Sequence, residues 1–335
     1  MLSMPGSDSG FGRRSLATLV GLGTAMALLA LSPRALAAPS NLIEELERVE
    51  AGALPLCPLP PDRRPLGRTI GELADQLRAA MDASAGGDSP VQTLNDFVFK
   101  ILAIRSSPDL HDPCNLLPSA VLDRKQGYCV GIAAVYLALA EKLGLPIHAV
   151  ATPSHVFLRY DGDERVNIET FERGASVPDA RYIAEQKIAP RSVRKGIFLR
   201  DLTSSEFLAQ VHNNLGVVYS HQQNYVAAAR EYDEALRLYR DFPAASYNWG
   251  NDLLRSGEYP KATRAFTRSL KLHPNDAWAL NNRGLAYRKL GQNGKARRDF
   301  EAALRLDPAF APARANLDAL NSGAPPALPD SPGLH

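Results

Sequence analysis

The second half of the chain repeats with a period of 34 residues, and this period constrains the fold more than any other feature of the sequence. Each recurring glycine is followed by a small residue after 12 positions, an aromatic residue after 16 and another small residue after 19. The recurring positions are Gly216, Gly250 and Gly284; Ala228, Ala262 and Ala296; Tyr232, Phe266 and Phe300; and Ala235, Ser269 and Ala303. The units close on prolines, at a displaced Pro243 and at Pro274 and Pro308. Because proline ends a helix and small residues let two helices approach closely, the period predicts stacked helix pairs.

Pattern and period together resemble the tetratricopeptide repeat over about residues 209–310. The resemblance implies an all-α solenoid of three repeats over 205–321, closed by a capping helix from Ala311 to Asn321. A solenoid of this kind presents a concave groove, so a peptide or protein partner is expected there. The proline-rich end, residues 322–335, is predicted to be disordered.

The first 37 residues have the features of a signal peptide. Arg13 and Arg14 precede an uncharged apolar stretch from Leu16 to Leu31, and Ala35-Leu36-Ala37 supplies the small-x-small pattern of a cleavage site. The apolar stretch is shorter than the ~20 residues that a membrane-spanning helix needs. We therefore predict cleavage of residues 1–37 and export to the periplasm or the medium, without an integral span afterwards. The Sec and twin-arginine routes both remain open.

Charge and motif content argue against several classes of function. The chain has 38 Lys and Arg residues against 36 Asp and Glu residues, and this net charge of +2 gives no electrostatic basis for binding nucleic acid. The cysteines and histidines lack the C-x-x-C and H-E-x-x-H spacings of zinc sites, and no glycine-rich phosphate loop precedes a helix. The sequence therefore predicts neither a metal nor another cofactor.

Residues 40–200 indicate a mixed α/β domain. Helical periodicity covers Thr69–Ala85 and Val91–Ile104, with Ser89 or Asp88 as the cap of the second helix. Strand-like runs follow at Ile147–Ala151, His155–Tyr160 and Arg165–Thr170, and the last two are joined at Asp161-Gly162-Asp163, which fits a hairpin turn.

A strongly periodic helix begins at Cys129. Its apolar residues form one stripe, predicted to be buried: Ile132, Val135, Tyr136, Leu139, Ala140 and Leu143. Gly144 is the predicted C-cap, and Pro146 prevents continuation. Cys129 lies in the first turn, where unpaired N–H groups and the helix dipole favour a thiolate. A thiolate nucleophile needs an imidazole beside it, and His155 begins a strand 26 residues later. Asn167 or Glu169, on one face of the next strand, could orient that imidazole.

These residues resemble the bacterial transglutaminase-like core, in the branch where that core precedes tetratricopeptide repeats. The segments that carry the resemblance are Gly127-Tyr128-Cys129-Val130-Gly131-Ile132, the helix after it, and Pro153-Ser154-His155-Val156. The resemblance implies an α+β papain-like domain over 40–200, with Cys129 as nucleophile and His155 as general acid and base. Glu169 takes the place of the usual aspartate, and Asn167 is the alternative third member. The implied chemistry is cleavage or transfer of an amide acyl group; the alternative is an inactive adaptor that acts through its repeats.

The cysteine count also bears on the site. Only Cys57, Cys114 and Cys129 occur, and an exported protein meets an oxidising compartment. Pairing of Cys57 with Cys114 leaves Cys129 as the free thiol, although an unbridged chain is equally compatible with the sequence.

Overall fold

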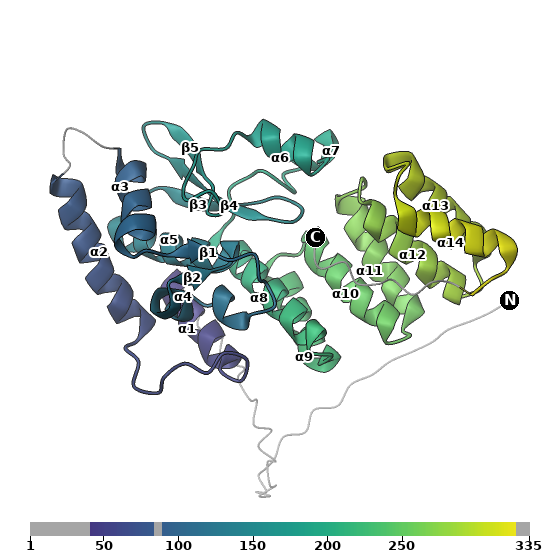
Figure 1. Cartoon of the computed structure of the whole chain (residues 1–335), viewed down its shortest axis with the longest axis horizontal. Helices are drawn as coiled ribbons and strands as arrows, with labels where there is room; N and C mark the ends of the chain where they lie inside the picture. The colour runs from purple at the N-terminus through teal and green to yellow at the C-terminus, as the bar shows by residue number, and fades with distance from the viewer. Residues whose placement is uncertain (1–40, 84–88, 326–335) are drawn as a thin grey trace, which may run out of the picture. The chain divides into compact units, whose positions relative to one another are not determined.

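The computed structural model describes residues 41–83 and 89–325. The predicted signal peptide (1–37) and residues 326–335 of the predicted tail lie outside the described residues. Figure 1 shows the succession of elements along the chain, from α1 to α14. A mixed α/β region with small sheets comes first and a helical array follows, which confirms the predicted fold class.

Three helices and a π-helical turn form the first part of the mixed region. They are α1 (Leu42–Ala53), α2 (Leu66–Ala83), α3 (Pro90–Asp96) and η1 (Phe97–Ile101). Ser89, one of the two predicted caps, caps α3 by accepting a hydrogen bond from the Gln92 N–H at 3.2 Å. The helix predicted to reach Ile104 ends earlier, because Ala103 takes a left-handed backbone conformation with φ 55°.

The helix that begins with the free cysteine lies at the centre of this region. Helix α5 (Cys129–Leu143) packs against α1, α2, α4 (Pro118–Arg124) and the short helix η2 (Pro113–Leu116). Its predicted C-cap, Gly144, is left-handed with φ 69°. The prediction of a single buried stripe was wrong, because all residues from Cys129 to Ala140 are buried. Helices and strands surround α5, so no face of this stretch is left for solvent.

Two small sheets complete the mixed region. Strands β1 (Arg105–Ser106) and β2 (Gln126–Gly127) pair in parallel just before α5. The larger sheet is antiparallel, in the order β3 (Ile147–Ala151), β4 (Val156–Asp161), β5 (Arg165–Ile168), and packs on α5. The predicted hairpin is present, but His155 immediately precedes β4 and Glu169 immediately follows β5. Helices α6 (Asp179–Glu185) and α7 (Pro190–Arg194) lead to the repeats.

The repeat region consists of three helix pairs and a final helix. The pairs are α8 (Ser204–His221) with α9 (Tyr225–Leu238), α10 (Pro243–Arg255) with α11 (Tyr259–Leu272), and α12 (Ala277–Lys289) with α13 (Asn293–Leu306); α14 (Ala311–Ser322) follows. The period has a steric cause. The recurring aromatic ring lies directly on the recurring glycine, and a Cβ on Gly250 would lie 2.7 Å from Cε1 of Phe266. Glycine is therefore needed for the two helices of each pair to approach.

Replacing Gly250 with Ala should destabilise the repeats. The added methyl group overlaps the buried Phe266 ring, and we expect a loss of about 1–3 kcal/mol in the free energy of unfolding. Urea denaturation would measure it. The matched control is Gly294→Ala, because nothing lies within 4 Å of a Cβ there. Equal stability of the two variants would show that the helices can separate without cost.

The first repeat shares its hydrophobic core with the mixed region. Helix α8 packs against α1, α5 and η2, and a single cluster of buried side chains runs from Leu42 of α1 to Ala245 of α10. The described residues, 41–83 and 89–325, accordingly form one unit by their contacts. The helix pair that the sequence assigns to a separate solenoid is thus packed against the helix that carries Cys129.

Candidate active site

Cys129 is held in place by a segment fixed through a disulfide. Cys57 and Cys114 are bonded, with Cα atoms 5.3 Å apart, so the predicted pairing is present and Cys129 is the free thiol. The disulfide anchors η2, whose Asn115 carbonyl accepts a hydrogen bond from the Tyr128 N–H at 2.8 Å. A Cβ on Gly131 would lie 2.1 Å from that same oxygen. Glycine at position 131 therefore lets η2 lie against the first turn of α5.

His155 faces two partners. Its imidazole Nε2 lies 2.9 and 2.8 Å from the two carboxylate oxygens of Glu169, and the ring lines the same small cavity as Cys129. Because Nε2 is turned to the carboxylate, Nδ1 is the nitrogen left for the sulfur. The Phe171 ring stacks on the imidazole with centroids 5.3 Å apart, which restricts its rotation. The structure thus brings Cys129, His155 and Glu169 together, with His155 hydrogen-bonded to Glu169 and lining one cavity with Cys129.

The Glu169 carboxylate is fixed by partners other than His155. Tyr182 donates its hydroxyl to Oε2 at 2.6 Å, and the Phe171 N–H donates to Oε1 at 2.9 Å. These bonds hold the longer side chain in one position, so the methylene that distinguishes glutamate from aspartate is accommodated. The sequence analysis missed both partners. Phe171 lies two residues after Glu169 in the sequence, whereas Tyr182, on α6, carries no local signal.

Charge at the site raises the basicity of the histidine. Burial by itself lowers the pKa of His155, but the Cys129 sulfur and the Glu169 carboxylate outweigh it and raise the pKa to about 10. Burial raises the pKa of Glu169, but its hydrogen bonds to His155, Tyr182 and Phe171 outweigh this and lower it. The arrangement favours an imidazolium between a carboxylate and the sulfur.

Asn167, the alternative third member, lies away from the imidazole. Its Oδ1 accepts from Arg159 Nε at 2.8 Å, and its Nδ2 donates to the Val177 carbonyl at 2.7 Å and to Asp179 at 2.8 Å. Arg159 is only 2% exposed and also pairs with Asp179 and Asp201. Asn167 therefore belongs to a buried polar network that holds the segment after Glu169, and Glu169 is the residue that contacts His155.

The thiol lies at the bottom of a small pocket. Cys129 is 1% exposed, and the cavity beside it has a volume of about 30 Å³. One wall is formed by residues around Cys129 and by Thr152 to Val156; the other comes from the repeats, through Gln210, Asn213, Asn214, Ala244 and Asn248. Residues of the first two repeats therefore complete this cavity.

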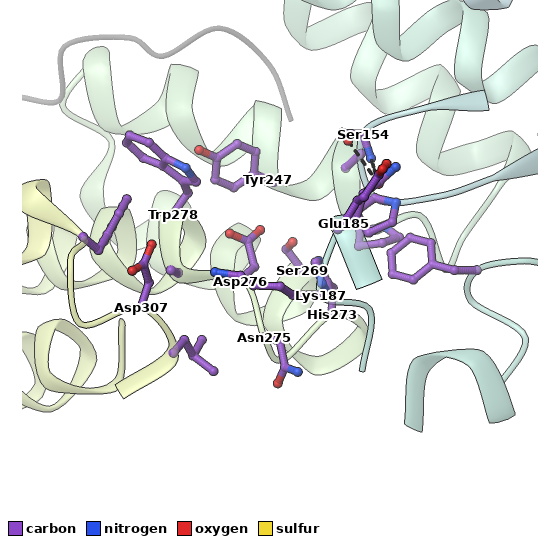
Figure 2. Close-up of a pocket in the computed structure, with 18 residues that line it drawn as sticks. Ser154, Glu185, Lys187, Tyr247, Ser269, His273, Asn275, Asp276, Trp278 and Asp307 are labelled. Carbon is purple, nitrogen blue, oxygen red and sulfur yellow. Dashed lines mark hydrogen bonds between the residues drawn. The ribbon is translucent and has the colours of Figure 1, made fainter. Parts of the chain in front are cut away.

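A larger pocket of about 300 Å³ adjoins the thiol pocket, and the two share Pro153, Ser154 and Ala244. Figure 2 shows Trp278 and Tyr247 on one side of it, Ser154 and Glu185 on the other, and Asp276 between them. Its lining combines four aromatic rings, three carboxylates and one ammonium group: Phe198, Tyr247, Trp278, Phe310, Glu185, Asp276, Asp307 and Lys187. Burial raises the pKa of Asp276 to about 6, which still leaves it ionised at neutral pH.

Neither a three-ligand metal cluster nor a membrane-spanning helix is found in the part of the chain that the structure describes. No three His, Cys, Asp or Glu side chains cluster there in a way that could hold a metal ion. No helix within 41–83 and 89–325 is both long enough and apolar enough to cross a bilayer.

Comparison with known proteins identifies both parts of the chain. A family model for the transglutaminase-like superfamily matches residues 65–213, and tetratricopeptide-repeat models match residues 209–242 and 251–322. The chain therefore has a transglutaminase-like core followed by tetratricopeptide repeats, as the sequence predicted. The matched regions overlap at residues 209–213, inside α8.

Curated relatives match just over half of this chain. A UPF0162 protein of Xylella fastidiosa is 24% identical over 195 residues, which cover 56% of this chain and 69% of that protein. A UPF0162 protein of Pseudomonas aeruginosa is 24% identical over 171 residues, covering 51% of this chain and 63% of that protein. Among solved structures, the tetratricopeptide domain of Arabidopsis OM64 has 21% identity and a TM-score of 0.35, covering 35% of this chain and 98% of that one.

Proposed function

We propose that this transglutaminase-like protein is an exported thiol enzyme that cleaves an amide or peptide bond. The observation that carries the proposal is the hydrogen-bonded pair of Glu169 and His155, whose imidazole lines one cavity with the free thiol Cys129. The Cys129 sulfur attacks the carbonyl carbon, the carbon–nitrogen bond breaks, and His155 gives its proton to the departing amine. Water then attacks the thioester and transfers a proton to His155. The carbon–sulfur bond breaks, the carboxylic acid leaves, and the Cys129 sulfur is free again.

The start of α5 supplies donors for the oxyanion. The first N–H groups of a helix have no acceptor within the helix, and Tyr128, the N-cap residue, forms no side-chain cap. These N–H groups lie beside the sulfur, where negative charge develops on the carbonyl oxygen. Water is the acceptor that we propose for the acyl group, because a cavity of about 30 Å³ has room for a water molecule.

The repeats are proposed to hold the substrate. The 300 Å³ pocket shares Pro153, Ser154 and Ala244 with the thiol pocket, so a peptide bound in it would lie next to the cavity at Cys129. Its aromatic rings suit an apolar side chain, and its excess of carboxylates suits a basic one. We propose a peptide or protein segment that carries both. Export is supported by the Cys57–Cys114 disulfide, since such bonds persist in oxidising compartments.

One observation favours a second function, that of an inactive adaptor. Cys129 is 1% exposed, and its cavity is too small for a peptide. An adaptor would use the repeats for binding and would keep the thiol only as a buried residue, because free cysteine packs well in protein interiors. The two functions predict different reactivity of the native thiol.

Labelling with methyl methanethiosulfonate at neutral pH distinguishes them. We expect modification of Cys129 in the folded protein, measured by mass spectrometry, and a rate lower by about 100-fold in His155→Ala, because the basic ring that shares the cavity with the sulfur is gone. His148→Ala, on the neighbouring strand, is the matched control and should leave the rate unchanged.

Replacement of the nucleophile completes this test. Cys129→Ala should abolish labelling and any amidase activity and change the thermal midpoint little. Labelling that occurs only after denaturation would favour the adaptor, and a large loss of stability in Cys129→Ala would indicate a packing role.

A further inference from the structure

Amide side chains from the repeats form one wall of the thiol pocket. Gln210, Asn213 and Asn214 come from α8, and Asn248 comes from α10. The asparagines satisfy one another: Asn248 Nδ2 donates to Asn213 Oδ1 at 3.0 Å, and Asn213 Nδ2 donates to Asn214 Oδ1 at 3.1 Å. These hydrogen bonds hold the three asparagine side chains in place, and Gln210 takes no part in them.

Gln210 has an unused donor in this pocket. Its side chain is 7% exposed, and its Nε2 is buried without a hydrogen-bond partner among the residues that the structure describes. Buried polar groups in folded proteins are nearly always paired, so a group left unpaired in a pocket indicates a ligand that completes it. The pocket that Gln210 lines also contains Cys129 and His155.

The chemistry of the donor identifies the group that it binds. An N–H donor needs an acceptor, and in an amide substrate the acceptor is the carbonyl oxygen, because the nitrogen carries hydrogen or becomes the leaving group. A carbonyl placed in a pocket of about 30 Å³ beside Cys129 is the one that the sulfur attacks.

We propose that Gln210 Nε2 donates a hydrogen bond to the oxygen of the acyl group under attack, so that the first tetratricopeptide repeat supplies part of the active site. This inference rests on the proposed function, because it needs Cys129 to act on a carbonyl. It adds a donor from α8 to those at the start of α5, on a different wall of the cavity. The repeats then hold the substrate and also contribute to the chemical step.

The test compares two small probes on the full mature chain. The acyl probe is p-nitrophenyl acetate, which places a carbonyl oxygen in the pocket; methyl methanethiosulfonate reacts with the same sulfur and has no carbonyl. Gln210→Met keeps the size of the side chain and removes the donor. We expect acetylation of Cys129 to slow by about 100- to 1,000-fold, as loss of one oxyanion donor does. The rate with the thiosulfonate should not change.

Controls separate this role from a structural one. Gln222→Met, at the exposed end of α8, should change neither rate. Because Gln210→Met removes an unpaired buried donor, its thermal midpoint should stay equal or rise, whereas a structural role predicts a fall. If Gln210→Met fails to fold, Gln210→Glu replaces the donor by an acceptor at the same size, and the ratio of the two rates is the readout.

Two results would overturn the proposal while the proposed function stands: an unchanged acetylation rate in Gln210→Met, or an equal fall of both rates. Failure of the proposed function is recognised separately, because the native wild-type thiol would then react with neither probe.

Discussion

Replacing Glu169 with Gln should slow acylation of Cys129 by about 100-fold or more. Three donors converge on this carboxylate, from the His155 imidazole, the Tyr182 hydroxyl and the Phe171 N–H. Glutamine keeps the shape but offers one oxygen and a donor in place of the second oxygen, so at least one of these hydrogen bonds is lost. The imidazole then loses both its charge partner and its fixed orientation. Release of p-nitrophenolate from p-nitrophenyl acetate measures the rate.

The same substitution should lower the pKa of His155. The wild-type value of about 10 depends on the Cys129 sulfur and on the Glu169 carboxylate, which favour the protonated ring. Amide hydrolysis needs that proton for the departing amine, so it should be lost as the pH rises through about 10. In Glu169→Gln, which lacks the carboxylate, amide hydrolysis should be lost at a lower pH. An NMR titration of the His155 ring checks the shift directly.

The matched control for Glu169 is Glu172→Gln. Glu172 lies three residues after Glu169, is exposed and pairs with Arg181. Neither the acylation rate nor the pKa of His155 should change in this variant. Equal rates in Glu169→Gln and the wild type would mean that the contact with His155 has no part in the reaction.

Removing the disulfide should have the largest effect on stability. The bond joins cysteines 57 positions apart, and in the chain-entropy model a loop of this length contributes about 4 kcal/mol to the free energy of unfolding. We expect the double variant Cys57→Ala/Cys114→Ala to lose that amount in urea denaturation. The rate at which Cys129 is labelled should also vary more between molecules. The reason is that η2, which supports the start of α5 through Asn115, is then no longer anchored.

Reduction provides the control for this prediction. Dithiothreitol should destabilise the wild type to about the level of the double variant and should not affect the double variant itself. A loss below about 1 kcal/mol in both experiments would show that packing around α1 and α4 holds η2 without the covalent bond.

The first repeat lines the thiol pocket and shares its hydrophobic core with the mixed region, so the repeats also have a structural role. Helix α8 packs against α5 and lines the cavity at Cys129, so deleting the repeats would also expose the hydrophobic core of the mixed region. Activity should therefore be measured on the chain that includes the repeats, because a truncated core domain would lack part of its hydrophobic core.

Local sequence patterns were sufficient to predict the repeats, helix α5, the hairpin and part of the site. The 34-residue period follows from glycine–aromatic contacts that recur identically, so it can be read without coordinates. The start of α5 at Cys129, its end at Gly144 and the hairpin are also encoded within a few residues of where they occur. The choice between Asn167 and Glu169 was not encoded in this way, because both lie on one face of the strand.

Tertiary structure decided that choice and the rest of the site. Arg159, buried beside Asn167, engages its amide, while Tyr182 from α6 and the Phe171 backbone fix Glu169 against His155. Gln210 lies 81 positions after Cys129 in the sequence, and only the packing of α8 on α5 brings the two to one cavity. Periodicity reports which face of an element is apolar, whereas contacts between distant side chains depend on how those faces pack together. The sequence alone therefore determined the repeats, the helix that begins at Cys129, the hairpin and the pairing of Cys129 with His155 as candidates, and the tertiary structure decided the residues that surround that pair.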